Sequence, residues 1–448
     1  MARAKKEAAL TPEERLQAAL VPDWEWPYKL PKNWCWTTVG TICDGFQYGY
    51  TEKATFEKIG PHFIRITDIG DGIINDSGAP YCKIDSDSFI KYKINKDDIL
   101  IARMGSVGEN GLATHNIDGV FASYLIRIVP RSNAKYVCNF LQTNLYWGQI
   151  SEKAQGTTRL NVNANVLKNL IIPLAPLAEQ QRIVDRIESL FAKLNEAKEK
   201  AQAVVDSFET RKAAILHKAF TGELTAKWRE EHGAGMDSWE KKSVGELCIS
   251  LKYGTAKKSD ASGNVVVLRM GNLQQGEIDW SDLAYSNDPD DIERYKLFPG
   301  DVLFNRTNSA ALVGKTAIYR GEHPAIYAGY LIKLDYDHDK IIGDYLNYAL
   351  NTLDAKKYCN SVKTDGVNQS NINAKKIGAY SFNVPNIPEQ EKIVSVIQKL
   401  LSKEQQSKAA AEAVLDQIDL MKKSILARAF RGELGTNDPS EESAVELL

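Results

Sequence analysis

Hydrophobic residues recur at alternating steps of four and three along two long stretches of the chain. The first series runs from Ile183 to Ile215 and the second from Ile393 to Ile425, and no proline or glycine interrupts either before Gly222 and Gly432. This spacing, kept over more than four heptads, predicts two long helices that each carry a coiled-coil seam. The predicted seam residues are Ile183, Ile187, Leu190, Leu194, Val204, Phe208 and Ile215, with Ile393, Ile397, Leu400, Val414, Ile418, Met421 and Ile425.

The two stretches are copies of each other. Residues 179–224 align without a gap on residues 389–434, and 20 of these 46 positions are identical. Both copies open with Glu-Gln and close with Ala-Phe-x-Gly-Glu-Leu. A single helix of about 60 Å would leave its apolar seam in water, so we expect the two copies to pair with each other. The alternative is that each helix pairs with another protein.

The duplication continues outside the helices, with loops of different length. Residues 62–69 resemble 266–273, and residues 97–103 resemble 300–306. Short β-branched runs separated by glycine, asparagine and aspartate predict strands in both halves. Residues 136–149 and 343–353 are expected to be helical. The chain therefore reads as an α+β domain, a long helix, a second α+β domain and a second long helix.

These patterns set the expected domain boundaries. The N-terminal arm should begin its helix after Thr11, a favourable N-cap followed by Pro12. In chain order, the predicted segments are an N-terminal helical arm (1–23), a first globular domain (24–175), a central repeat helix (176–232), a second globular domain (233–385), a distal repeat helix (386–436) and an acidic tail (437–448).

Composition narrows the function classes only a little. The 448 residues carry a formal net charge of −2, so a contact with DNA must rest on local clusters rather than on a strongly basic surface. Six cysteines are scattered singly, a pattern typical of reduced thiols in a cytoplasm. No signal peptide or apolar run long enough to span a membrane is evident, so we expect a cytoplasmic protein.

Motifs of catalysis are missing. The chain has neither the Asn/Asp-Pro-Pro-aromatic tetrapeptide nor the glycine-rich cofactor loop of a DNA methyltransferase. Residues 313–316 imitate a phosphate loop, but Ser309 occupies the place of its first glycine and a strand-like run follows. The acidic residues 288–291 are expected to form a solvated turn, and the histidines show no metal spacing. We therefore predict no catalytic residues and no metal site.

Polar and aromatic residues on glycine-rich loops have instead the character of a recognition surface. Arginine can read guanine, and asparagine or glutamine can read adenine, while lysine and backbone amides hold phosphates. Alternatively, each residue belongs to an ordinary polar loop, and the arginines are ion-pair anchors of the fold. The candidate DNA-binding residues are Gln47, Tyr48, Tyr50, Arg65, Arg103 and Ser106 in the first domain, and Tyr253, Lys257, Lys258, Arg269, Gln274, Arg306 and Asn308 in the second.

The order of these pieces resembles the specificity subunit of Type I restriction-modification enzymes over essentially the whole chain. The matching motifs are Leu30-Pro31 with Trp34 and Trp36, Pro-Leu-Ala-Glu-Gln-Gln-Arg-Ile-Val at 176–184, Ile-Pro-Glu-Gln at 387–390, and the Ala-Phe-x-Gly-Glu-Leu closures at 219–224 and 429–434. The second domain departs from the pattern, because residues 239–245 open it without the Leu-Pro pair.

The resemblance implies a role and a set of partners. Each globular domain would be a target recognition domain that reads one half of a split, asymmetric sequence in double-stranded DNA. The two helices would form an antiparallel coiled coil with pseudo-twofold symmetry that acts as a spacer and docks two methyltransferase subunits. The chain itself would be non-catalytic and bind no cofactor. The methyltransferase partners would bind S-adenosylmethionine and methylate adenine N6, and two restriction subunits would use ATP and Mg.

A rival interpretation is a coiled-coil scaffold that bridges protein partners and reads no DNA. The sequence does not give the target bases, because no readable code links these loops to bases.

Overall fold

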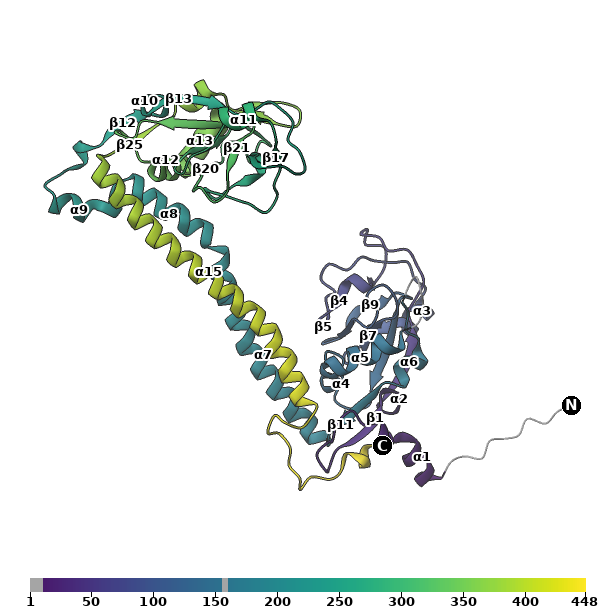
Figure 1. Cartoon of the computed structure of the whole chain (residues 1–448). Helices are drawn as coiled ribbons and strands as arrows, with labels where there is room; N and C mark the ends of the chain where they lie inside the picture. Colours follow the sequence, from purple (N-terminus) through teal and green to yellow (C-terminus); the bar gives the residue numbers. More distant parts are fainter. Residues whose placement is uncertain (1–10, 155–159) are drawn as a thin grey trace. The chain divides into compact units, whose positions relative to one another are not determined.

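The computed structural model describes residues 11–154 and 160–448, and this part of the chain divides into two units. The first unit comprises residues 1–201 together with 413–448, and the second comprises residues 202–412. Each unit holds one α+β domain and one stretch of paired helices (Figure 1). The predicted α+β class with an internal duplication is confirmed.

The first unit is built around a six-stranded sheet of order β2-β10-β7-β8-β5-β4. Most of its neighbours are antiparallel, and short pairs flank it, including β1 with β11 and the parallel pair β3 with β9. The strands are β1 (Cys35–Thr38), β2 (Cys43–Tyr48), β3 (His62–Ile64), β4 (Ile69–Gly70), β5 (Gly72–Ile74), β6 (Lys93–Ile94), β7 (Ile99–Ala102), β8 (Asn110–Leu112), β9 (Ile117–Phe121), β10 (Leu125–Pro130) and β11 (Ile171–Leu174). The helices are α1 (Pro12–Ala19), α2 (Val39–Ile42), α3 (Ser86–Tyr92), α4 (Ala134–Phe140), α5 (Asn144–Lys153) and α6 (Ala164–Lys168).

The second unit repeats this plan with a four-stranded sheet of order β13-β22-β18-β20. Its parallel pair is β14 with β21, and β12 pairs with β25 as β1 does with β11. The strands are β12 (Glu240–Ser243), β13 (Cys248–Tyr253), β14 (Val265–Leu268), β15 (Leu273–Gln274), β16 (Glu277–Ile278), β17 (Tyr285–Ser286), β18 (Val302–Asn305), β19 (Thr307–Asn308), β20 (Thr316–Ile318), β21 (Ala325–Tyr327), β22 (Leu331–Tyr336), β23 (Thr364–Asp365), β24 (Ser370–Asn371) and β25 (Ser381–Val384). The helices are α9 (Ala226–Glu231), α10 (Val244–Leu247), α11 (Pro289–Arg294), α12 (Gly343–Leu350), α13 (Leu353–Val362) and α14 (Ala374–Gly378).

The repeat helices are α7 (Leu177–Asp206), α8 (Phe208–Phe220) and α15 (Ile387–Ala429). In the first unit, Lys422 of α15 donates to Asn195 of α7, whereas Arg182, earlier on α7, reaches Glu441 beyond the end of α15. In the second unit, Arg211 of α8 pairs with Glu404 of α15, whereas Arg229, beyond the end of α8, reaches Glu389 near the start of α15. In both units the helices are therefore antiparallel, as predicted, and Figure 1 shows α15 beside α7 and beside α8.

The seam differs from the prediction in the last third of α15. Val414 and Met421 are 40% and 51% exposed, so they do not belong to it. Lys422, next to Met421, faces the partner helix instead, because its alkyl stem brings its amine over the Phe191 ring. The other predicted seam residues are buried or half-buried.

Three predicted helices are interrupted. The first repeat helix breaks at Ser207, whose hydroxyl bonds back to the Ala203 carbonyl and competes with the backbone ladder. The helix expected over residues 136–149 ends at Phe140 and restarts after Thr143, whose side chain caps α5. Thr352 divides the helix expected over 343–353 in the same way.

The N-terminal arm and the tail are partly as expected. Thr11 forms a capping box with Glu14 at the start of α1, while residues 1–10 lie outside the described part. The predicted acidic tail packs on the first unit: Ala444 is buried, and its amide donates to the Asn33 carbonyl. It therefore belongs to the fold of that unit.

A buried carboxylate fastens each domain to the start of its helix. Glu179 and Glu389 are fully buried, and each accepts a hydrogen bond from a tryptophan indole, Trp34 at 2.7 Å and Trp239 at 3.0 Å. Because a buried carboxylate is costly without donors, these contacts fix the entry of the helix into the domain.

The two anchors differ in their remaining donors. Glu389 also pairs with the buried guanidinium of Arg229 at 2.6 Å. Glu179 receives only neutral donors in addition to Trp34, namely the Asn437 amide at 2.9 Å and the Thr436 hydroxyl. The linker after α8 therefore completes the second anchor, and the C-terminal tail completes the first.

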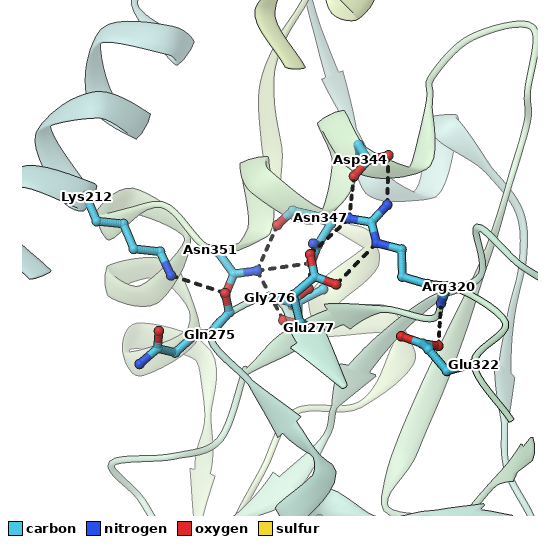
Figure 2. A network of polar contacts seen from close by, with 10 residues as sticks. Lys212, Gln275, Gly276, Glu277, Arg320, Glu322, Asp344, Asn347 and Asn351 are labelled. Carbon is cyan, nitrogen blue, oxygen red and sulfur yellow. Dashed lines mark hydrogen bonds and ion pairs between the residues drawn. The ribbon is translucent and has the colours of Figure 1, made fainter. Parts of the chain in front are cut away.

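A second polar network holds the domain of the second unit against α8 (Figure 2). Lys212 of α8 donates to the Gln275 carbonyl, and burial lowers the pKa of its amine. Beside it, Arg320 bridges Glu277 and Asp344 with paired contacts. The counterpart of Lys212 in the first unit is Lys422, which donates instead to Asn195 of the partner helix α7.

We predict that Arg229→Ala lowers the free energy of unfolding of the second unit by about 3–5 kcal/mol, since it leaves Glu389 buried without its cation. Urea denaturation of the full chain measures this loss. Asn437→Ala, which removes a neutral donor from Glu179, is the matched control and should cost about 1–2 kcal/mol. Equal losses in the two variants would contradict the assigned difference between the anchors.

Candidate nucleic-acid interface

The strand order of each sheet brings three residues together where neighbouring strands end or begin. In the first unit, β2 and β7 both run antiparallel to β10, with Tyr48 opposite Ile126 and Ala102 opposite Leu125. The end of β2, the end of β7 and the start of β10 therefore meet. These positions carry Tyr48, Arg103 and Tyr124.

The second unit forms the same edge from β13, β18 and β22. Tyr253 lies opposite Ile332, and Asn305 lies opposite Leu331. The corresponding residues are Tyr253, Arg306 and Tyr330. We call Tyr48, Arg103 and Tyr124, and separately Tyr253, Arg306 and Tyr330, the reading edge of each unit.

Each reading edge has the same internal contacts. The guanidinium carbon of Arg103 lies 4.8 Å from the ring centre of Tyr48, and Arg306 lies 4.8 Å from that of Tyr253. The backbone amide of each arginine donates to the carbonyl of the second tyrosine, Tyr124 or Tyr330. An arginine stacked on a tyrosine is held in place while its charge stays near the surface.

The first residue of a short helix, α6 or α14, contacts each edge. The Ala164 amide donates to the Tyr48 hydroxyl at 3.1 Å, and the Ala374 amide donates to the Tyr253 hydroxyl at 3.0 Å. The tyrosines are nevertheless 39% and 42% exposed, and Tyr124 and Tyr330 are 54% and 48% exposed. Two solvent-facing tyrosines, one of them stacked with an arginine, form a surface that can stack on bases and donate to their edges.

Glycine is required beside the first tyrosine of each edge. A Cβ on Gly49 would lie 2.3 Å from the carbonyl oxygens of Phe121 and Ala122, and one on Gly254 would lie 2.1 Å from the Tyr327 oxygen. This close backbone approach brings Tyr48 and Tyr253 to the sheet edge.

Four predicted residues lie at or beside the reading edges in addition to Tyr48, Arg103, Tyr253 and Arg306. Ser106 is exposed in the loop after Arg103. Asn308 follows Arg306 in β19 and pairs with Ser370. Lys258 is exposed on the loop after Tyr253, and Lys257 beside it is paired with Asp288 at 2.6 Å. The hydrogen bond from Lys257 lowers the pKa of Asp288, and Asp288 raises that of Lys257.

The remaining predicted residues make contacts within their own domains, and their role in DNA binding stays a prediction. Arg65 pairs with Asp68 and Arg269 with Asp282, which are ion pairs of the kind raised as the alternative from the sequence. Gln47 accepts from Arg127, and Gln274 accepts from Lys315. Tyr50 packs against Tyr92, with ring centres 5.4 Å apart.

Tyr124 and Tyr330 were missed by the sequence prediction. Both stand at the same place in the duplicated segment before a strand, at 123–127 and 329–333, and both precede a leucine that turns inward. A tyrosine retained in two otherwise divergent copies, just outside a buried strand, was the available signal.

Two features of the described residues bear on other functions. No group of three or more histidine, cysteine, aspartate or glutamate side chains within residues 11–154 and 160–448 could hold a metal ion. No helix in the same part of the chain is both long and apolar enough to cross a bilayer.

Comparison with known proteins finds matches over most of the chain. The family model for the Type I restriction modification DNA specificity domain matches residues 37–205 and again 236–413. The Type I restriction enzyme StySPI specificity subunit of Salmonella potsdam is 25% identical over 423 residues, covering 91% of this chain and 90% of that protein. The EcoKI specificity subunit of Escherichia coli strain K12 is 26% identical over 427 residues, with the same coverage.

Solved structures have the same fold. A chain from a study of complex assembly and conformational transition of the type I R-M system superposes with a TM-score of 0.69 at 20% identity, covering 91% of this chain and 100% of that one. The HsdS subunit from Thermoanaerobacter tengcongensis superposes with a TM-score of 0.60 at 21% identity, covering 92% and 100%.

We predict that Gly254→Ala destabilises the second unit by about 1–3 kcal/mol, because the new methyl group overlaps the Tyr327 and Ala328 carbonyls. Differential scanning calorimetry should show Tm lowered by about 2–10 °C for a unit of this size. Gly271→Ala is the control, since its Cβ would meet no atom within 4 Å. An unchanged Tm in Gly254→Ala would show that the close approach does not position Tyr253.

Proposed function

Because the chain belongs to the Type I restriction modification DNA specificity domain family, and is a DNA specificity subunit, we propose that it reads a bipartite, asymmetric DNA target. Each reading edge contacts one half of the target. The paired helices dock two methyltransferase subunits, and restriction subunits join that complex.

One observation supports the bipartite target above the others. The two units carry the same tyrosine–arginine–tyrosine edge, built on equivalent strands, but with different neighbouring residues. Met104-Gly105-Ser106 follows Arg103, whereas Thr307-Asn308-Ser309 follows Arg306, so two of the three neighbouring positions differ. Equal frames with unequal side chains are expected to read unequal half-sites.

The chemistry of the edges suits the major groove. Arg103 and Arg306 can donate two hydrogen bonds to guanine, and Asn308 can pair with adenine. Lys258 can hold a phosphate and set the register. The near-neutral net charge is compatible with this role if the partners supply much of the grip on the phosphates.

The chain's part in the reaction is recognition without catalysis. Methyl transfer to adenine N6 would belong to the methyltransferase subunits, which would bind S-adenosylmethionine. Cleavage would belong to the restriction subunits with ATP and Mg.

A gel-shift titration of the chain with its methyltransferase partner tests the proposal. The complex should bind its target at least about 10³-fold more tightly than a scrambled duplex of equal length, as specific DNA-binding proteins do. Equal affinity for both duplexes would refute it.

We further predict that Arg103→Ala and Arg306→Ala each impair one half-site. Loss of a bidentate contact to guanine costs about 1–3 kcal/mol of discrimination. Titrations with duplexes in which only one half-site is scrambled should show that each variant loses discrimination at a different half.

Arg131→Ala is the control for these variants. Arg131 follows the opposite end of β10 and pairs with Asp44. It should leave discrimination at both halves unchanged. Arg103→Ala and Arg306→Ala affecting the same half-site would contradict the assignment of one reading edge to each half.

A further inference from the structure

A large groove lies beside α8 in the second unit. Its volume is about 830 Å³, within the range of sites that take a bulky ligand group. It is bounded by α8, by the adjoining ends of α12 and α13, and by β12 and β25. Its mainly apolar lining includes Ala213, Ala214, Phe220, Ala349, Leu353 and Phe382.

The internal duplication identifies the same place in the first unit. By the constant offset of 210 residues, Phe220 and Thr221 of the groove correspond to Phe430 and Arg431. Strand pairing gives a third correspondence: Lys241 lies opposite Asn383, as Trp36 lies opposite Pro173. Lys241 therefore corresponds to Trp36.

In the first unit these three counterparts all contact Tyr28. The Tyr28 hydroxyl donates to the Phe430 carbonyl at 3.0 Å. Its ring lies 5.0 Å from the Trp36 ring, between centroids, and 5.3 Å from the Arg431 guanidinium carbon. Burial at this position raises the pKa of Tyr28. The segment of the first domain that precedes β1 thus places an aromatic side chain here.

The second unit has no such side chain of its own. Trp34 and Trp239 are equivalent, since each precedes the first strand of its domain and binds the buried glutamate. Counting back equally from both, Tyr28 corresponds to Gly233, and residues 233–238 contain no aromatic residue. The Tyr28 hydroxyl donates to the Phe430 carbonyl, and the counterpart of that acceptor in the second unit is the Phe220 carbonyl. Phe220 is the last residue of α8, so its carbonyl has no intrahelical donor.

We propose that this groove receives an aromatic side chain, on an extended segment, from a methyltransferase subunit. The inference rests on the proposed function, because it takes the partner from there. The chemistry of the occupant comes from Tyr28: an aromatic ring with a donor that reaches the Phe220 carbonyl. A DNA strand does not suit a mainly apolar lining. A second copy of this chain is a poorer occupant, because its own Tyr28 is already engaged in its first unit.

Ala214→Trp tests the proposal by filling the groove from α8. Ser424→Trp is the matched control, because Ser424 is the counterpart of Ala214 and is likewise exposed. We expect Ala214→Trp to weaken binding of one methyltransferase subunit at least tenfold, and Ser424→Trp to change it less than twofold. Isothermal titration of the full chain with the methyltransferase subunit measures affinity and stoichiometry, and circular dichroism verifies folding of both variants. Unchanged affinity in a folded Ala214→Trp would overturn the proposal.

A photo-crosslinking residue in place of Thr221, at the rim of the groove, identifies the occupant directly. In the assembled complex with DNA, the crosslink should reach an aromatic-containing peptide of the methyltransferase subunit. A crosslink only to a second copy of the chain or to DNA, or no crosslink, would overturn the proposal. If wild-type chain bound no methyltransferase subunit at all, the proposed function itself would fail, and the titration distinguishes that result.

Discussion

The burial of one glutamate at the start of each repeat helix is the interaction on which the rest of the structure depends. Glu179 and Glu389 sit where a recognition domain meets the helix pair, and a tryptophan from the opening of that domain donates to each. The next residue reinforces the joint: Gln180 binds the Ala175 carbonyl, and Gln390 binds the Pro385 carbonyl. A carboxylate out of water tolerates little displacement of its donors. The joint therefore gives each reading edge a defined position on its own helices.

The buried glutamates also show how different segments of one chain complete the two units. In the second unit the segment after α8 supplies Arg229 to Glu389, and in the first the C-terminal tail supplies Asn437 to Glu179. The C-terminal tail thus supplies a donor to the buried glutamate of the first unit, as the central linker does in the second. The two units share this arrangement around the buried glutamate, whereas the loops around Ser106 and Asn308 differ between them. A protein whose two domains recognise different sequences requires this combination of equal domain–helix contacts and unequal loops.

The sequence was most informative where a single physical requirement dominates. Heptad spacing located both repeat helices and most of their seam, because an apolar stripe must be buried along its whole length. It failed at Val414 and Met421, since Lys422 can bury its stem and still expose its amine. It also missed the breaks at Thr143 and Thr352, where a side-chain cap competes with helix continuation.

The reading edges were only partly predictable, because they depend on strand order. Tyr48 and Arg103 come from strands separated by β10, and only the sheet brings them within stacking distance. For the same reason Arg65 and Arg269 resembled base-reading residues in sequence, although each has an aspartate partner within its own domain. Residues alone do not show which arginine has an aspartate partner within its own domain.

Exchange of the first recognition domain provides the most direct measurement. Residues 24–175 would be replaced by the matching domain of a relative with another target, and methylated adenines would be mapped across the host genome by single-molecule sequencing. If each unit reads independently, one half of the recognised sequence changes and the other half stays as in the wild-type chain. A map in which both halves change together, or in which neither changes, would contradict a chain built from two separate readers.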